Sequence, residues 1–143
     1  MKRTISMVLI CSFIFIFVGC NRQEKAKQDI FNLVEKNYDA ILKACEDKDT
    51  DLLLAIDGIT QVKIIDGYVL VYCKGAGIAP SSQDYGFYYS EENSPVAVDC
   101  NLYIMCRAGS LTPEGNGFQY VVSGNTFYTE HIKGNIYLYS NSY

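Results

Sequence analysis

The sequence predicts an α+β domain in which an N-terminal amphipathic helix packs on a curved antiparallel β-sheet, a meander of about six or seven strands. Two observations carry this prediction. Apolar residues recur at three- and four-residue steps from Glu24 to Asp47, without glycine or proline. After Asp57-Gly58 the apolar period becomes two, and turn residues follow every few positions. A chain of 143 residues predicts one domain.

Residues 1–19 read as a targeting segment and lie outside the fold. Lys2 and Arg3 precede an apolar run from Val8 to Val18, which is the pattern of a secretory signal. This run is shorter than the roughly 20 residues that a bilayer-spanning helix needs.

The signal ends in Phe17-Val18-Gly19-Cys20, which resembles the lipobox of bacterial lipoproteins at Gly19 and Cys20. The resemblance implies that Cys20 receives a diacylglyceryl thioether and becomes the new N-terminus. We therefore expect a lipid anchor at Cys20, a short linker over 20–23 and a single domain over 24–143, on the extracytoplasmic face of the cell membrane. Basic side chains beside the anchor either attract anionic lipid or solvate the start of the helix: Arg22, Lys25 and Lys27.

The helix over Glu24–Asp47 presents one apolar stripe for packing and one charged face. After it, Asp49 or Thr50 caps a short helical turn over Leu52–Ile56, because their side-chain oxygens accept from exposed helix amides. The clearest hairpin joins Gln61–Ile65 to Tyr68–Lys74 through Asp66-Gly67. Loops are predicted over Gly75–Ser82 and Gly109–Gly117, and the remaining strands over Tyr85–Ser90, Val96–Ile104, Phe118–Val122, Thr126–Ile132 and Ile136–Tyr139. For Val96–Ile104 the alternative is an interruption at Asp99 and Asn101.

Acidic side chains outnumber basic ones by 16 to 12. This balance argues against a nucleic-acid partner, because binding to phosphates requires a basic surface. The sequence contains no cofactor motif, so we expect no cofactor.

Four cysteines remain once the signal and the anchor are set aside. An even number outside the cytoplasm favours disulfides, with three connectivities open. If Cys100 and Cys106 share one continuous strand they lie about 20 Å apart, and Cys73 would then bond one of them. The alternative is that some of the four are small buried apolar side chains. The candidates are Cys45, Cys73, Cys100 and Cys106.

His131 is the only histidine. Together with Cys73, Cys100 or Cys106 it would provide a thiol-dependent enzyme, but on a strand Glu130 and His131 point to opposite faces, and an ordinary strand histidine is the simpler interpretation.

Asp47, Asp49 and Asp51 have the spacing that begins a calcium loop. The rest of that pattern fails, because Leu52 and Gly58 stand where glycine and glutamate are needed. We therefore expect no metal site.

The chain has twelve tyrosines and no tryptophan. Tyrosine suits both half-buried sheet faces and recognition surfaces. If the helix covers one face of the sheet, the other face can present aromatic side chains to a protein, peptide or glycan; packing in the core is the alternative. The candidate binding surface consists of Tyr85, Phe87, Tyr89, Tyr137 and Tyr139.

Three segments, Gly77–Ser82, Tyr85–Ser90 and Gly115–Phe118, together resemble a group of small, uncharacterised secreted or lipid-anchored proteins of Gram-positive bacteria. The resemblance implies location and a single β-rich domain, and it brings no catalytic residue.

From these observations we expect a non-enzymatic, lipid-anchored binding module. The alternatives are a protective or inhibitory lipoprotein of the immunity type, and a small thiol-dependent enzyme.

Overall fold

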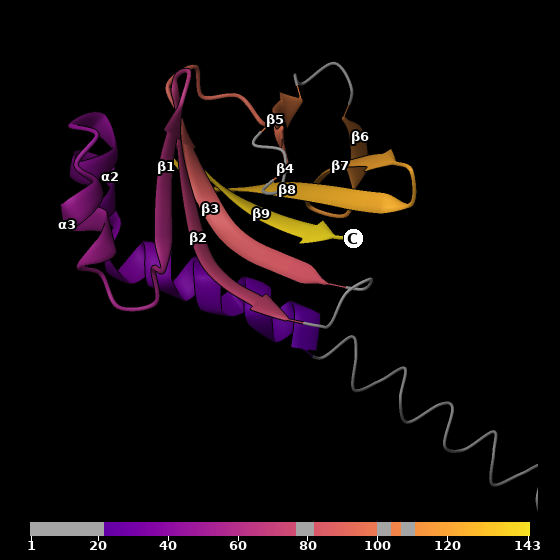
Figure 1. The fold of residues 1–143 in the computed structure, drawn as a ribbon, viewed down its shortest axis with the longest axis horizontal. Helices are drawn as coiled ribbons and strands as arrows, with labels where there is room; N and C mark the ends of the chain where they lie inside the picture. The colour runs from indigo at the N-terminus through magenta and orange to yellow at the C-terminus, as the bar shows by residue number, and fades with distance from the viewer. Residues whose placement is uncertain (1–21, 77–81, 100–103, 107–110) are drawn as a thin grey trace, which may run out of the picture.

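The computed structural model describes residues 22–76, 82–99, 104–106 and 111–143. Within them lie a seven-stranded antiparallel sheet of order β1-β2-β3-β9-β8-β7-β6, a two-stranded sheet β4-β5, and helices (Figure 1). The predicted class, mixed α+β with an antiparallel sheet, is confirmed.

The helical part does not form the single N-terminal helix predicted over Glu24–Asp47. One helix covers 22–36, a turn follows at Asn37, and α2 (Tyr38–Glu46) and α3 (Thr50–Leu54) come next. The side-chain amide of Asn37 donates to the carbonyl oxygen of Leu33 at 2.9 Å. An asparagine side chain that bonds the local backbone competes with the helix, which accounts for the break.

The predicted hairpin is confirmed. β1 (Gln61–Ile65) pairs with β2 (Tyr68–Ala76), and the turn residues Asp66 and Gly67 have φ of 29° and 84°. Positive φ at both positions matches the turn to the twist of the strands.

The prediction of a continuous meander is wrong. β3 (Gln83–Ser90) pairs with β2 on one side and with β9 (Ile136–Ser142) on the other. The sheet therefore consists of two meanders joined where β3 meets the last strand. The second meander is completed by β6 (Thr112–Glu114), β7 (Gly117–Val122) and β8 (Asn125–Lys133). β6 occupies part of the predicted loop over Gly109–Gly117.

The strand predicted over Val96–Ile104 is not continuous, which is the alternative that the sequence left open. The chain forms β4 (Ala97–Asp99) and β5 (Ile104–Cys106), which pair with each other as a separate small sheet.

Two apolar clusters pack on opposite faces of the main sheet, because successive strand residues point to opposite sides. On one face Phe87 and Leu138 pack with Ile30 and Val34 of the helix over 22–36. On the other face the cluster contains Leu70, Tyr88, Tyr137 and Tyr139 from the main sheet, together with Val98 of β4 and Val96, which directly precedes β4. In Figure 1 the helix over 22–36 runs across one side of β2 and β3, and β4 and β5 lie toward the other. Both faces of the sheet are thus covered in their central part.

Candidate functional site

The aromatic surface predicted from the sequence is not exposed. Tyr85, Phe87 and Tyr89 belong to the cluster beneath the helices, and Tyr137 and Tyr139 belong to the cluster beneath β4; none of the five is more than 8% exposed. The prediction of a binding surface at these residues is therefore wrong. The physical reason is that the central part of each sheet face has its own cover, so these five aromatic side chains are core.

The helix-covered face changes from apolar to polar along the strands. Alternate residues of a strand share a face, and on β9 these are Ile136 and Leu138 followed by Ser140 and Ser142. The register places Tyr128 of β8 opposite Ser140. The same pairing places Thr126 of β8 and Gln83 of β3 opposite Ser142. A polar end of the sheet results, next to the start of the helix over 22–36.

A cleft of about 660 Å³ lies at this polar end. Its volume falls within the range of about 300–1,000 Å³ that small-molecule sites occupy. One wall comes from the helix, one from β3, β8 and β9, and a third from the β6–β7 turn. The lining residues are Gln23, Glu24, Lys27, Gln28, Phe31, Gln83, Glu114, Gly115, Asn116, Thr126, Tyr128, Glu130, Ser140 and Ser142.

Tyr128 is the aromatic side chain of the β8 wall. Its hydroxyl donates to Oε2 of Glu130 at 2.7 Å, and Nζ of Lys27 lies 4.0 Å from the centre of its ring. The hydrogen bond fixes the ring from its edge, and the ammonium group covers one face. The three side chains thus link the helix to the sheet across the cleft.

The cleft has an acidic balance, with three carboxylates at Glu24, Glu114 and Glu130 against the ammonium of Lys27. The pKa of Tyr128 is raised above its ordinary value of 10.0, first by burial and then by Glu130, Glu24 and Glu114. A negative field disfavours the phenolate. The phenol therefore remains protonated, and the cleft favours positively charged groups.

The cysteines do not form the predicted disulfides at the positions that the structure describes. Cys45 and Cys73 are free and buried, and burial raises the pKa of each thiol from 9.0 to about 12. Reactive cysteines have lowered thiol pKa values, so these two have the character of core side chains. Cys100 lies outside the described residues, as does the side chain of Cys106.

His131 lies apart from the cleft. Its ring is exposed, with Nε2 2.8 Å from the carbonyl oxygen of Gly134 and the ring centre 5.1 Å from that of Tyr137. Glu130 lines the cleft on the opposite face, as strand alternation predicted. The strand order places β3 and β9 between β8 and Cys73 of β2, so the structure brings His131 to neither of the two described thiols.

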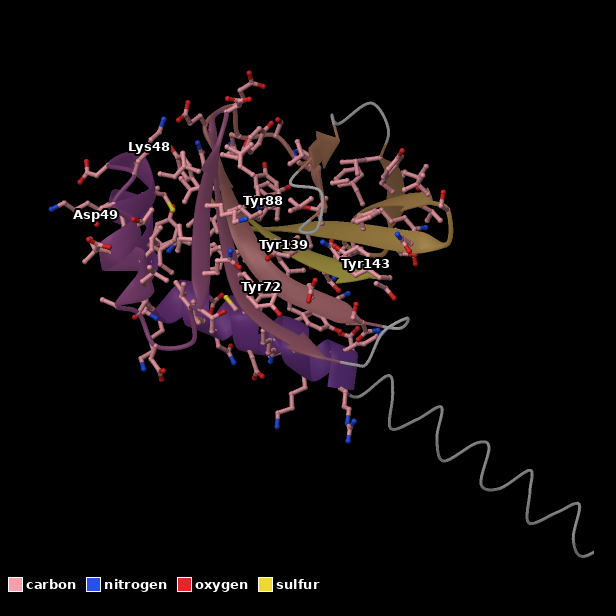
Figure 2. The ribbon with its side chains drawn as sticks, in the orientation of Figure 1. Lys48, Asp49, Tyr72, Tyr88, Tyr139 and Tyr143 are labelled. Atoms are coloured by element: carbon pink, nitrogen blue, oxygen red, sulfur yellow. The ribbon has the colours of Figure 1, made fainter. Side chains whose placement is uncertain are left out.

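The three aspartates of the incomplete calcium pattern lie around the α2–α3 loop, where Figure 2 labels Lys48 and Asp49. Asp49, one of the two predicted caps, accepts from the N–H of Leu52 at 2.9 Å and caps α3, which begins at Thr50 rather than at Leu52. In the described part of the chain, no group of three histidine, cysteine or acidic side chains is arranged to hold a metal ion.

The predicted anchor residue Cys20 lies outside the described residues. Among the helices that are described, none has the length and apolarity to cross a membrane.

Comparison with known proteins finds no match to this chain among family models, curated proteins or solved structures. Fold and site define the protein as a small α+β domain with a polar, acidic cleft beside its first described helix. Sequence reasoning missed this cleft. The signal that could have found it is the change from Ile136 and Leu138 to Ser140 and Ser142 at alternate positions of one strand.

Proposed function

We propose that the protein is a lipid-anchored binding module of the extracytoplasmic membrane surface, and that it holds its ligand in the cleft rather than on an aromatic sheet face. The observation that carries the proposal is the cleft itself, a cavity of about 660 Å³ between the helix over 22–36 and the polar ends of β3, β8 and β9. The role is binding without chemistry.

The composition of the cleft wall favours recognition of a polar ligand. Thr126, Ser140 and Ser142 supply hydroxyls, and Gln28 and Gln83 supply amides. Such groups both donate and accept hydrogen bonds, so they suit the hydroxyls of a glycan or the amides of a peptide. The described thiols have raised pKa values, which argues against a cysteine nucleophile as the reason for the cleft.

The place of the cleft agrees with an anchor at Cys20. Gln23 belongs to the cleft wall and stands only three residues after Cys20. Three extended residues span at most about 11 Å. A lipidated Cys20 would therefore hold the cleft close to the membrane, within reach of a ligand in the cell envelope.

The predicted packing of the first helix on a curved sheet supports the proposed binding role. In the proposed module the helix that follows the anchor lies on the concave side of a curved sheet and keeps one wall of the cleft in place. Ala26, Ile30 and Val34 bury that helix in the same cluster as Phe87 and Leu138. A wall held by a packed core costs little to order when ligand binds.

The anchor is tested by intact mass measurement on protein extracted from bacterial membranes. We expect the loss of residues 1–19 and the added mass of acyl chains, and release of Cys20→Ala from the membrane fraction. An unlipidated mass, or a Cys20→Ala protein that stays in the membrane fraction, would overturn the anchor.

The cleft is tested by native mass spectrometry of the same extracted protein with its retained ligand. Ser142→Leu places a bulky apolar group in the cleft and should abolish retention. Gln61→Leu is the matched control, because it adds the same side chain at an exposed position of the edge strand β1, and it should retain ligand normally. Equal retention by both variants would show that the cleft is not the site.

A further inference from the structure

Lys27 occupies a position in the cleft that a ligand could take. Its Nζ lies 4.0 Å from the ring centre of Tyr128, while the phenol hydroxyl at the edge of the ring donates to Oε2 of Glu130 at 2.7 Å. The aromatic face is therefore presented in a fixed orientation, and an ammonium group already covers it.

The ammonium group of Lys27 can be displaced from the Tyr128 ring by another cation. Nζ of Lys27 lies over the Tyr128 ring, whereas the ammonium groups of Lys48 and Lys74 lie 3.1 Å and 2.7 Å from the carboxylates of Glu91 and Asp29. Cation–π contacts at partly exposed sites are weak, and a lysine side chain has a long flexible stem. Lys27 can swing out of the cleft at small cost.

The surroundings of the ring attract more positive charge than Lys27 supplies. Glu24, Glu114 and Glu130 contribute three carboxylates to the lining. All three raise the pKa of the Tyr128 phenol, so each acts electrostatically at this ring. A cation that enters the cleft meets an aromatic face and an excess of negative charge at one place.

We infer that the cleft binds an alkylammonium ligand, whose ammonium group replaces that of Lys27 over the Tyr128 ring while the hydroxyls of Thr126, Ser140 and Ser142 hold the rest of the molecule. The inference rests on the proposed function, since it names the ligand class of the same cleft. Lys27 acts as an intramolecular competitor of the ligand for the Tyr128 ring. The ammonium comes either from a lysine side chain of a peptide or from a free polyamine.

The test is calorimetric titration of the full chain with three probes at low salt. The first is tri-lysine with acetylated N-terminus and amidated C-terminus, the second is the same peptide with acetylated ε-amines, and the third is spermidine. We expect binding of a charged probe and none of the ε-acetylated peptide, because acetylation removes the ammonium charge. Tighter binding of tri-lysine assigns a peptide source, and tighter binding of spermidine assigns a polyamine.

The diagnostic variant is Lys27→Met, which keeps the length of the side chain and removes the charge. Loss of the competitor and of its positive charge should tighten binding of the charged probe by at least about threefold. Lys133→Met is the matched control, because Nζ of Lys133 lies 4.1 Å from the ring centre of Tyr38 in an equivalent contact away from the cleft lining. This control should leave the affinity unchanged. Glu130→Gln should weaken binding.

Unchanged or weaker binding by Lys27→Met would overturn the inference, as would equal binding of the charged and ε-acetylated peptides. The proposed function is tested separately by ligand retention in Ser142→Leu. If that variant loses its retained ligand but no ammonium probe binds the unmodified protein, the ligand class is wrong and the binding cleft stands. If no ammonium probe binds and Ser142→Leu still retains its ligand, both the binding cleft and the ligand class are wrong.

Discussion

The hydroxyl oxygen of Tyr88 accepts a hydrogen bond from the backbone N–H of Val96 at 2.9 Å. The same hydroxyl lies 2.7 Å from Oγ1 of Thr129, and the Tyr88 ring stacks on Tyr137 with a centroid separation of 5.3 Å. Tyr88 is fully buried at the middle of the sheet, where Figure 2 labels it near Tyr139. The hydroxyl of Tyr88 on β3 thus links Val96, directly before β4, to Thr129 of β8 and helps to hold the cover on the second face of the sheet.

Tyr88→Phe should lower the free energy of unfolding by about 1–3 kcal/mol, because the buried N–H of Val96 loses its partner. Urea unfolding followed by circular dichroism measures this loss. Tyr137→Phe is the control: its hydroxyl bonds the exposed residue Asn93, so its removal should cost about 0.5–1 kcal/mol. An equal decrease in the free energy of unfolding of the two variants would contradict the role of the Tyr88 hydroxyl as the buried partner of Val96.

Asp49→Ala should destabilise the protein by about 0.5–2 kcal/mol, since the N–H of Leu52 loses its cap. Thermal unfolding with and without calcium provides the measurement. Neither the native protein nor the variant should respond to the ion, because Asp49 serves as a helix cap. A calcium-dependent rise in melting temperature that Asp49→Ala removes would instead favour a metal role for the aspartates.

The thiols of Cys45 and Cys73 should resist alkylation in the folded protein up to about pH 9 and react once it is unfolded, because the buried thiols remain protonated. Peptide mapping after iodoacetamide treatment reports each site. Fast labelling of either cysteine in the native protein would contradict the burial that raises its pKa.

The raised thiol pKa values also predict an alkaline loss of stability. Each pKa is about 12 in the folded protein against an ordinary value of 9.0. The unfolded chain therefore releases these protons first as pH rises, and the thiols' contribution is complete below pH 9 and is lost between about pH 9 and 12. The free energy of unfolding should fall less steeply over the start of this range in the Cys45→Ala, Cys73→Ala double variant. An unchanged slope would contradict the assignment.

Gly86→Ala should be among the most damaging small substitutions. A Cβ at this position would collide with the carbonyl oxygen of Val71 and with the side chain of Tyr139. Overpacking against backbone cannot relax easily, and we expect a loss of about 3 kcal/mol. Gly124→Ala is the comparison, because its Cβ meets open space and only the positive φ of 87° is strained, at about 1 kcal/mol. Urea unfolding of both variants decides whether close packing at Gly86 dominates.

Local signals account for the parts of the fold that the sequence predicted correctly. The Asp66-Gly67 turn, the Asp49 cap and the period-two strands each depend on residues that are neighbours in the chain. The break of the long helix also has a local cause in Asn37. The apolar stripe continues on both sides of Asn37, so the periodicity does not reveal the break.

By itself, the sequence determined the mixed α+β class, the first hairpin and the cap of α3, because backbone preferences and alternation act over a few residues. Only the tertiary structure decided that β3 pairs with β9, that Tyr85 and Tyr137 are core on opposite faces, and that Lys27 meets Tyr128. The physical reason is that burial and pairing depend on what covers a residue. For these side chains the cover comes from segments tens of residues away.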